Sequence, residues 1–295
     1  MKEVILEDFE ALKALNDRVE HPEFVRSVVL SLPLQRLPPL ISRFHRLEKL
    51  VLKKTQLQTL GVSAKKLKQL SSVYVYESPS IDYQQFFAEL SAFSIHSLGL
   101  YFNEITHLPD NLSQLATLER LDIRQNAKID INASLASMIS LKELHFMSRR
   151  AEELPANICT LPNLEILQIE EGKGLRSIPR DFTLLSSLQK MRIYRSYKLN
   201  IHELVNMLSS LISLKLLGIQ VQNIEFLPAN LLQLRQLEKL ELDIDEPFQK
   251  FPDFIHHLKH LNYLRFTFAE ELPPQEERER IVANLPSTEV VFTTP

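Results

Sequence analysis

One leucine pattern recurs along almost the whole sequence and constrains the fold more than any other feature. Its clearest copy, residues 108–126, reads LPDNLSQLATLERLDIRQN. Apolar residues first recur every three positions and then every second position, so a helical turn leads into a short strand. A single unit of this kind has nothing behind it to bury the apolar row. It therefore needs copies of itself on both sides.

The copies are present. The first position of an LxxLxL core falls at residues 25, 47, 70, 95, 118, 141, 164, 188, 214, 237, 261 and 285, so successive copies begin 22 to 26 residues apart. We predict an array of about twelve repeats, each with one strand of a parallel sheet. The predicted strands are 25–30, 47–52, 70–75, 95–100, 118–123, 141–146, 164–169, 188–193, 214–219, 237–242, 261–266 and, in a degenerate copy, 285–290.

The segments between the strands fall into two kinds. Five repeats place a proline after an apolar residue, at Pro109, Pro155, Pro179, Pro228 and Pro252, and proline fixes φ at the start of the return path. Three repeats lack it, over 81–93, 131–139 and 201–211. These segments have helical apolar spacing after an Asp or Asn, which predicts longer helices on the convex side.

The two ends differ from the repeats. Residues 2–20 have acids on one face and apolar residues on the other, which predicts a capping helix that ends before Pro22. At the other end, 273–283 predicts a charged helix and 290–292 a last short strand. We therefore expect a single domain over 1–295, with an N-terminal cap helix in 1–24, repeats in 25–272 and a C-terminal cap in 273–295.

With its pattern LPxxIxxLxxLxxLxLxxN, the array resembles leucine-rich repeats of the 23-residue class, of the Ras-group and plant-intracellular type that is also widespread in bacterial cytosolic proteins. The opening and closing segments look like the caps of the bacterial versions. The resemblance implies an α/β solenoid, a horseshoe with a parallel concave β-sheet. It implies a protein-binding scaffold as the general function, without naming a partner.

The chain departs from this family at the buried asparagine ladder. Asparagine stands at the ladder position only in Asn103 and Asn126. Hydroxyl side chains can replace part of this bonding, but other residues cannot, so we expect irregular curvature. The remaining ladder positions are Thr55, Ser78, Arg149, Gly172, Ser196, Gln222, Asp245 and Ala269.

Charge and cysteine content narrow the setting. The formal net charge is -3 without a long basic run, so we expect neither a nucleic acid nor a membrane surface as partner. We see no secretory signal and no membrane-spanning run. Cys159 is the only cysteine, which we expect to be buried and inert. These features favour a cytoplasmic protein, although export without a cleavable signal stays open.

Functional residues are expected on the concave face, where equivalent residues of neighbouring strands form columns. Tyrosine and arginine are frequent anchors of protein interfaces. We expect Gly99 to leave a notch beside the aromatic residues. The alternative is that tyrosine simply suits a strand and that the face has no ligand. The candidate partner-binding residues are Tyr74, Tyr76, Tyr101, Phe102, Arg124, His145, Met147, Glu170, Arg192 and Tyr194.

Catalytic and metal sites have little support. His256 and His260 have a spacing that could hold a metal on a helix, but no further ligand lies near them. The 172–174 segment, Gly-Lys-Gly, lacks the rest of a phosphate loop and predicts a turn. We therefore expect no enzymatic activity, no cofactor and no metal.

The sequence thus predicts a monomeric, non-enzymatic scaffold that binds a partner protein on its concave face. Alternatives are a regulator of a small GTPase or phosphatase, a translocated host-targeting effector, and a structural protein that self-associates through the edge strand 25–30 or through aromatic residues of the convex side. An enzyme is the remaining alternative.

Overall fold

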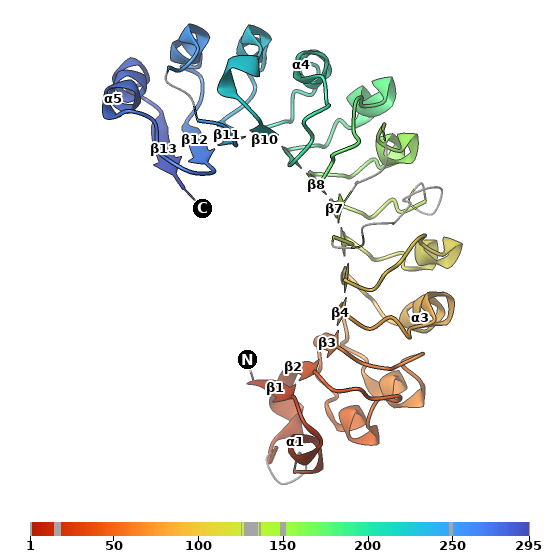
Figure 1. The fold of residues 1–295 in the computed structure, drawn as a ribbon. Coiled ribbons are helices and arrows are strands. Elements are labelled where there is room, and N and C mark those ends of the chain that lie inside the picture. Colours follow the sequence, from red (N-terminus) through yellow and green to blue (C-terminus); the bar gives the residue numbers. More distant parts are fainter. Residues whose placement is uncertain are drawn as a thin grey trace. The chain divides into compact units, whose positions relative to one another are not determined.

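A computed structural model describes residues 2–14, 19–124, 126, 135, 137–147, 152–247 and 250–294. The chain forms two compact units, Met1–Phe146 and Met147–Pro295, and each is described by itself. Within each unit, parallel strands follow one another in chain order and helices cover one face of the sheet (Figure 1). We call the other face of the sheet, predicted to be concave, the open face.

The first unit begins with a strand that the repeat pattern does not predict. The strands, in order, are β1 Lys2–Leu6, β2 Val25–Leu30, β3 Lys49–Lys53, β4 Ser72–Tyr76, β5 Ser97–Tyr101, β6 Arg120–Asp122 and β7 Glu143–Met147. Their register places the predicted column residues side by side, for example Val51 opposite Tyr74 and Gly99 opposite Asp122. The predicted columns are therefore confirmed here.

The second unit has the same arrangement. Its strands are β8 Ile166–Glu170, β9 Lys190–Ile193, β10 Leu216–Val221, β11 Lys239–Ile244, β12 Tyr263–Phe268 and β13 Glu289–Thr293. Gly218 pairs with Arg192 on one side and with Glu241 on the other, again as the columns predict. Each of the twelve predicted copies thus has its strand, from β2 to β13. Most begin about two residues later than predicted, because the first leucine of each core packs inward before the hydrogen bonds to the neighbouring strands start.

The predicted difference between repeats with and without proline is confirmed in the described residues. A proline precedes six short 3₁₀ helices: η2 Pro39–Arg43, η4 Asp110–Gln114, η6 Ala156–Thr160, η7 Arg180–Leu184, η9 Ala229–Gln233 and η10 Asp253–His257. Three further 3₁₀ helices are η1 Pro22–Phe24, η3 Val62–Lys66 and η8 Ile224–Phe226.

Two repeats without proline form α-helices, α3 Tyr83–Leu90 and α4 Ile201–Leu208. The side chain of Asp82 accepts a hydrogen bond from the Gln85 amide, and Asn200 accepts one from Glu203, so the predicted caps fix both helix starts. The third predicted helix, over 131–139, falls largely outside the described residues, as does ladder position Arg149.

The N-terminal prediction is wrong over 2–6. These residues form β1, which pairs in parallel with β2, because Val4 and Leu6 alternate with the acids and point away from them. Helix α1, Phe9–Lys13, is short and buries none of its residues. Since β1 covers β2, the segment 25–30 is not the sheet edge that a self-associating array would use.

The C-terminal prediction is confirmed. Helix α5, Gln275–Asn284, begins after Pro274, and β13 follows it. The aromatic rings of Phe251, Phe266 and Phe292 pack together beneath this end, with 4.7 Å between the first two ring centroids and 5.4 Å between the last two. None of the helices described here is long and apolar enough to cross a membrane.

The strands end in two different ways. After β3, β4 and β5 the next residue, Lys54, Glu77 or Phe102, has a positive φ of 52°, 47° or 56°. This left-handed turn brings the following polar side chain under the strand ends. After the equivalent point in β10, β11 and β12 the strand continues for one residue more, into Val221, Ile244 and Phe268, which are buried.

The polar residues after the left-handed turns form a buried ladder. Asn126 Oδ1 accepts from the Asn103 amide at 3.0 Å, and Asn103 Oδ1 accepts from the Ser78 amide at 2.8 Å. Ser78 Oγ continues the series by accepting from the Thr55 amide at 3.0 Å. Hydroxyl groups therefore do replace asparagine, as predicted. In the late repeats the backbone takes this role, since Asp245 N donates to Val221 O and Ala269 N donates to Ile244 O.

Candidate interaction surface

An aromatic cluster lies on the open face of the first unit. The rings of Tyr76 and Tyr101 are stacked, with 4.5 Å between centroids and 13° between planes. Lys53 Nζ lies 5.5 Å from the centroid of Tyr76, within the range of a cation–π contact. Tyr74 shares a hydrogen bond of 2.9 Å with Ser97. The predicted neighbourhood of the three tyrosines is confirmed, and these contacts hold their rings in place.

The predicted notch at Gly99 is wrong. A Cβ atom at this position would lie 2.5 Å from Tyr74 Cδ1 and 2.6 Å from Tyr101 Cε2. The two rings therefore already occupy the space that the missing side chain leaves. The absence of a side chain at Gly99 makes room for both rings, and it does not leave a pocket for a partner.

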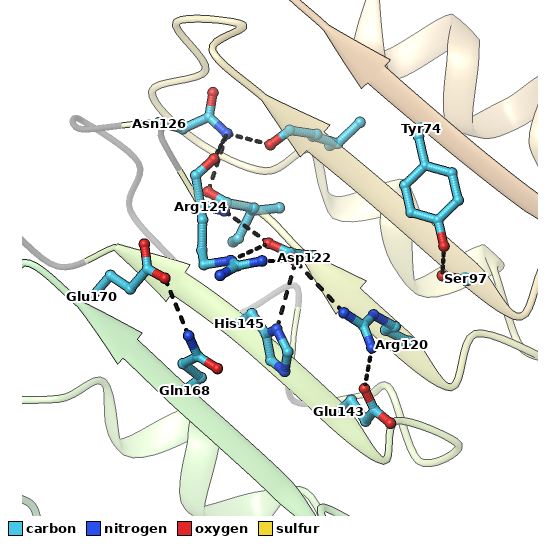
Figure 2. Close-up of polar contacts among 12 residues, drawn as sticks. Tyr74, Ser97, Arg120, Asp122, Arg124, Asn126, Glu143, His145, Gln168 and Glu170 are labelled. Carbon is cyan, nitrogen blue, oxygen red and sulfur yellow. Dashed lines mark hydrogen bonds and ion pairs between the residues drawn. The ribbon is translucent and has the colours of Figure 1, made fainter. Parts of the chain in front are cut away.

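Beside the tyrosines, a buried carboxylate orients several side chains. Asp122 is completely buried, and Arg124 donates to it from Nε at 2.9 Å and from Nη2 at 2.8 Å. His145 Nδ1 lies 3.5 Å from Asp122 Oδ2, at the outer limit of a hydrogen bond. Arg120 lies farther away, with Nη2 3.9 Å from Asp122 Oδ2 (Figure 2). The aspartate therefore fixes the guanidinium of Arg124 at the surface.

The charge state of Asp122 follows from these contacts. Burial by itself raises the pKa of a carboxyl group. The nearby ring of His145 and the hydrogen bonds and positive charge of Arg124 outweigh burial and hold the Asp122 pKa well below its usual range. Burial and the negative charge of Asp122 raise the pKa of the neighbouring Tyr101. The carboxylate is therefore charged and the tyrosine neutral over the whole physiological pH range.

The predicted site residues differ in how much a partner could reach. Phe102, with its positive φ, is 53% exposed, whereas His145 is 8% exposed and Met147 2%. The prediction that His145 and Met147 line an accessible surface is wrong, because both pack into the protein. Tyr74, Tyr76, Tyr101 and Arg124 are half-buried, each with part of the side chain open to solvent.

On the second unit the candidate Arg192 lies in an ion-pair network. Arg192 forms a two-pronged pair with Glu241, at 2.8 Å from Nε and 3.0 Å from Nη2. Arg265 adds a contact of 3.2 Å to the same carboxylate. Arg192 reaches across a whole strand because Gly218 lies beneath it, where a Cβ atom would be 2.9 Å from Arg192 Cγ.

Acids dominate the rest of this surface. Burial, ahead of the charges of Glu241 and Asp245, raises the pKa of Asp243. Burial and the charge of Asp243 raise the pKa of Tyr194 to about 12. Glu170 accepts from Gln168 Nε2 at 3.1 Å. Sequence reasoning did not select the partners Asp122, Glu241 and Asp243, although all three lie in the predicted columns. The pair between Arg192 and Glu241 depends on the glycine between their strands, Gly218.

The residues considered for other chemistry have ordinary surroundings. The 3₁₀ helix η10 ends at His257, so His256 and His260 do not share a helix. The guanidinium of Arg280 contacts His256, which disfavours a bound cation. Cys159 is buried, as predicted, and burial raises its pKa to about 11. Residues 173–174 form the predicted turn. Within the described ranges no cluster of three or more His, Cys, Asp or Glu could hold a metal.

A further hollow lies away from the open face. It has a volume of about 520 Å³ and lies between the first turn of α3 and the 103–110 segment of the next repeat. Its wall includes Tyr83, Asn103 and Pro109. None of the candidate partner-binding residues lines this hollow, so it is separate from the surface described above.

Repeats with one parallel strand each, a turn or helix on the opposite side and a buried polar ladder define a leucine-rich repeat solenoid. No family model matches the chain. Among solved structures, it is similar to a leucine-rich repeat protein of Leptospira interrogans, with 19% identity, 98% of this chain and 99% of that chain covered, and a TM-score of 0.47. It is also similar to an internalin from Listeria monocytogenes, with 15% identity, coverage of 90% and 79%, and a TM-score of 0.49.

Proposed function

We propose that the protein is a non-enzymatic scaffold and that a partner protein binds the open face of its first unit, around Tyr76, Tyr101, Phe102 and Arg124. The observation that supports this most is the stacked pair Tyr76–Tyr101 beside a guanidinium that a buried aspartate holds in place. Side chains that are already fixed lose little rotamer freedom on binding, so more of the contact energy appears as affinity.

The composition of this surface also supports an interface. Tyrosine and arginine are enriched at the centres of protein interfaces. Phe102 adds an exposed aromatic side chain directly after Tyr101, and Lys53 adds a charge over the Tyr76 ring. We propose further that the repeats are of the 23-residue class, which the proline-initiated turns support. A cytoplasmic location fits the single buried cysteine.

The test is affinity capture from native lysate with mass spectrometry, comparing wild type with the double variant Tyr76→Ala, Phe102→Ala. Arg124 is left intact, because its removal would leave Asp122 charged and buried without its main partner. Tyr194→Ala on the second unit is the matched control. We expect a partner that wild type and the control retain and the double variant loses. Retention by all three would refute this location of the interface.

If the proteins captured by wild type are the same as those on an empty support, the scaffold proposal itself is refuted. Circular dichroism and urea unfolding of each variant must first show that the fold is kept. The two changed side chains lie outside the core, so we expect their stability to stay within about 1 kcal/mol of wild type.

A further inference from the structure

The first four strands carry a regular pattern on the open face. In each strand three alternate residues face the same way, and the register aligns them with those of the next strand. The four sets are Glu3 and Ile5 on β1 with Glu7 just after it; Ser27 and Val29 on β2 with Ser31 just after it; Lys49, Val51 and Lys53 on β3; and Ser72, Tyr74 and Tyr76 on β4.

All of these residues except Ser27 and Ser72 line a hollow with a volume of about 350 Å³. Its centre is apolar, because Ile5, Val29 and Val51 lie in one row across the strands. The β2 residues of this set have small side chains, so they lie lower than the β1 and β3 residues on either side. The longer side chains of β1 and β3 form the two walls. Ile5 is 52% exposed, so an apolar surface at this site is open to a partner.

The two walls carry opposite charges. Glu3 and Glu7 are exposed on the β1 wall, and Glu3 accepts a hydrogen bond from Ser27 Oγ at 2.8 Å. Lys49 and Lys53 are exposed on the β3 wall, where their ammonium groups lie over the rings of Tyr74 and Tyr76 at 5.3 and 5.5 Å from the centroids. Neither lysine forms an ion pair with any residue that the structure describes.

The distance between the walls is set by the sheet. Neighbouring strands lie about 4.8 Å apart, so the acidic β1 wall and the basic β3 wall are about 10 Å apart, with β2 between them. A helix rises about 5.4 Å per turn. Residues i, i+3 or i+4, and i+7 of a helix that crosses the strands would therefore lie above β1, β2 and β3 in turn.

We propose that this hollow binds an amphipathic α-helix of the partner protein, which crosses the strands and carries a basic residue and an acidic residue seven positions apart. The basic side chain pairs with Glu3 and Glu7, and the acidic one pairs with Lys49 and Lys53. Aliphatic residues midway between them pack on Val29 and Val51. This inference rests on the proposed function and names the kind of partner segment that binds beside the tyrosine pair.

The experiment uses the full chain, immobilised, and a displayed library of helical peptides. The library fixes leucine at i+3 and i+4 and randomises positions i and i+7 between lysine and glutamate. Wild type should enrich peptides with opposite charges, in either order, because a helix can lie in both directions. The variant Glu3→Lys, Glu7→Lys should enrich two glutamates, and Lys49→Glu, Lys53→Glu should enrich two lysines.

Peptides selected on wild type should bind each double variant at least tenfold more weakly. Lys190→Glu, an exposed change on β9 of the second unit, is the matched control and should leave the selection unchanged. All four changed side chains of the hollow are exposed, so the variants should fold, which thermal melts can verify.

Two results would overturn the inference. One is that no helical peptide is enriched. The other is that enriched peptides keep the same charges on all variants. If such peptides are nevertheless lost on Tyr76→Ala, Phe102→Ala, the open face binds protein and only the helix pairing is wrong. The lysate capture described above tests the proposed function separately, since it does not depend on the charged residues of the two walls.

Discussion

The repeats that contain β3, β4 and β5 and those that contain β10, β11 and β12 satisfy the backbone at their strand ends by different means. In the early group a left-handed residue turns the chain and a buried Thr, Ser or Asn side chain accepts the next amide. In the late group the strand runs on and backbone carbonyls accept the amides of Asp245 and Ala269. One architecture thus tolerates two solutions to the same hydrogen-bonding requirement.

In two of the three late repeats the side chain at this position favours the extended backbone. Lys54, Glu77 and Phe102 have unbranched Cβ atoms and can adopt a positive φ at moderate cost. Val221 and Ile244 are β-branched, for which this conformation is much less favourable, and the extended chain also buries their side chains. The absence of asparagine in the late repeats is therefore matched by a local change of backbone. It does not leave a gap in the ladder.

The sharpest way to break this comparison is to remove the buried residue of the late group. Ile244→Ala should lower the free energy of unfolding by about 2–5 kcal/mol, since it deletes buried apolar volume from a strand. Glu77→Ala, at the equivalent early position, should change it by less than about 0.5 kcal/mol because Glu77 is exposed. Urea unfolding monitored by circular dichroism measures both. Equal losses for the two variants would contradict the proposed division.

The converse test removes the ladder side chain. Asn103→Ala should cost about 2–4 kcal/mol, because the Ser78 amide and the Val75 carbonyl each lose a buried partner and each such group is worth about 1–3 kcal/mol. Gln222→Ala, at the equivalent late position, is exposed and should be close to neutral. If Gln222→Ala proved as costly as Asn103→Ala, the late repeats would depend on a side-chain ladder after all.

Two aspartates, the buried Asp122 and the half-buried Asp243, sharpen the comparison through pH. The folded-state pKa of Asp122 lies below the unfolded value of about 3.9, so its contribution is present above that value and is lost as the pH falls toward the folded pKa. Asp122→Asn should destabilise the protein at pH 7, with a smaller deficit toward pH 3. The pKa of Asp243 is raised, so its ionisation opposes folding at pH 7.

Asp243→Asn should accordingly be neutral or stabilising at pH 7, with any gain shrinking as the pH falls. Chemical unfolding of wild type and both variants at pH 7, 5, 4 and 3 provides the measurement. An Asp243→Asn protein that loses as much stability at pH 7 as Asp122→Asn would show that the two carboxylates have the same environment, against the contacts described here.

The smallest expected effect concerns the left-handed turn. Glu77→Gly should leave stability unchanged or raise it by up to about 1 kcal/mol, because glycine adopts a positive φ freely while its greater freedom in the unfolded chain offsets part of the gain. Val221→Gly should instead destabilise, since it removes a buried side chain from a strand. A clear loss on Glu77→Gly would mean that its side chain stabilises the turn.

The sequence was sufficient for the features that depend on short-range pattern. The strands, the columns and the helices α3 and α4 follow from apolar spacing and from the caps at Asp82 and Asn200, which act within one turn. These signals are local, so one sequence contains them. Cys159 is a similar case, because its place in the repeat fixes its burial.

The remaining features depend on contacts between repeats. Residues 2–6 become a strand because β2 offers an edge to pair with, which their amphipathic pattern does not reveal. Gly99 looks like a notch until the reach of Tyr74 and Tyr101 is known. His145 and Met147 occupy column positions yet are buried, since column membership does not tell how a side chain packs.

The contact between Arg192 and Glu241 has a consequence for how the array unfolds. In a linear repeat protein each unit interacts with its immediate neighbours, and stability is a sum of unit and nearest-neighbour terms. Arg192 passes over Gly218 and pairs with a residue two strands away, which adds a term between second neighbours. The repeats of β9, β10 and β11 should therefore unfold together as one cooperative block. Fraying that starts at the C-terminal end would release all three repeats in one step.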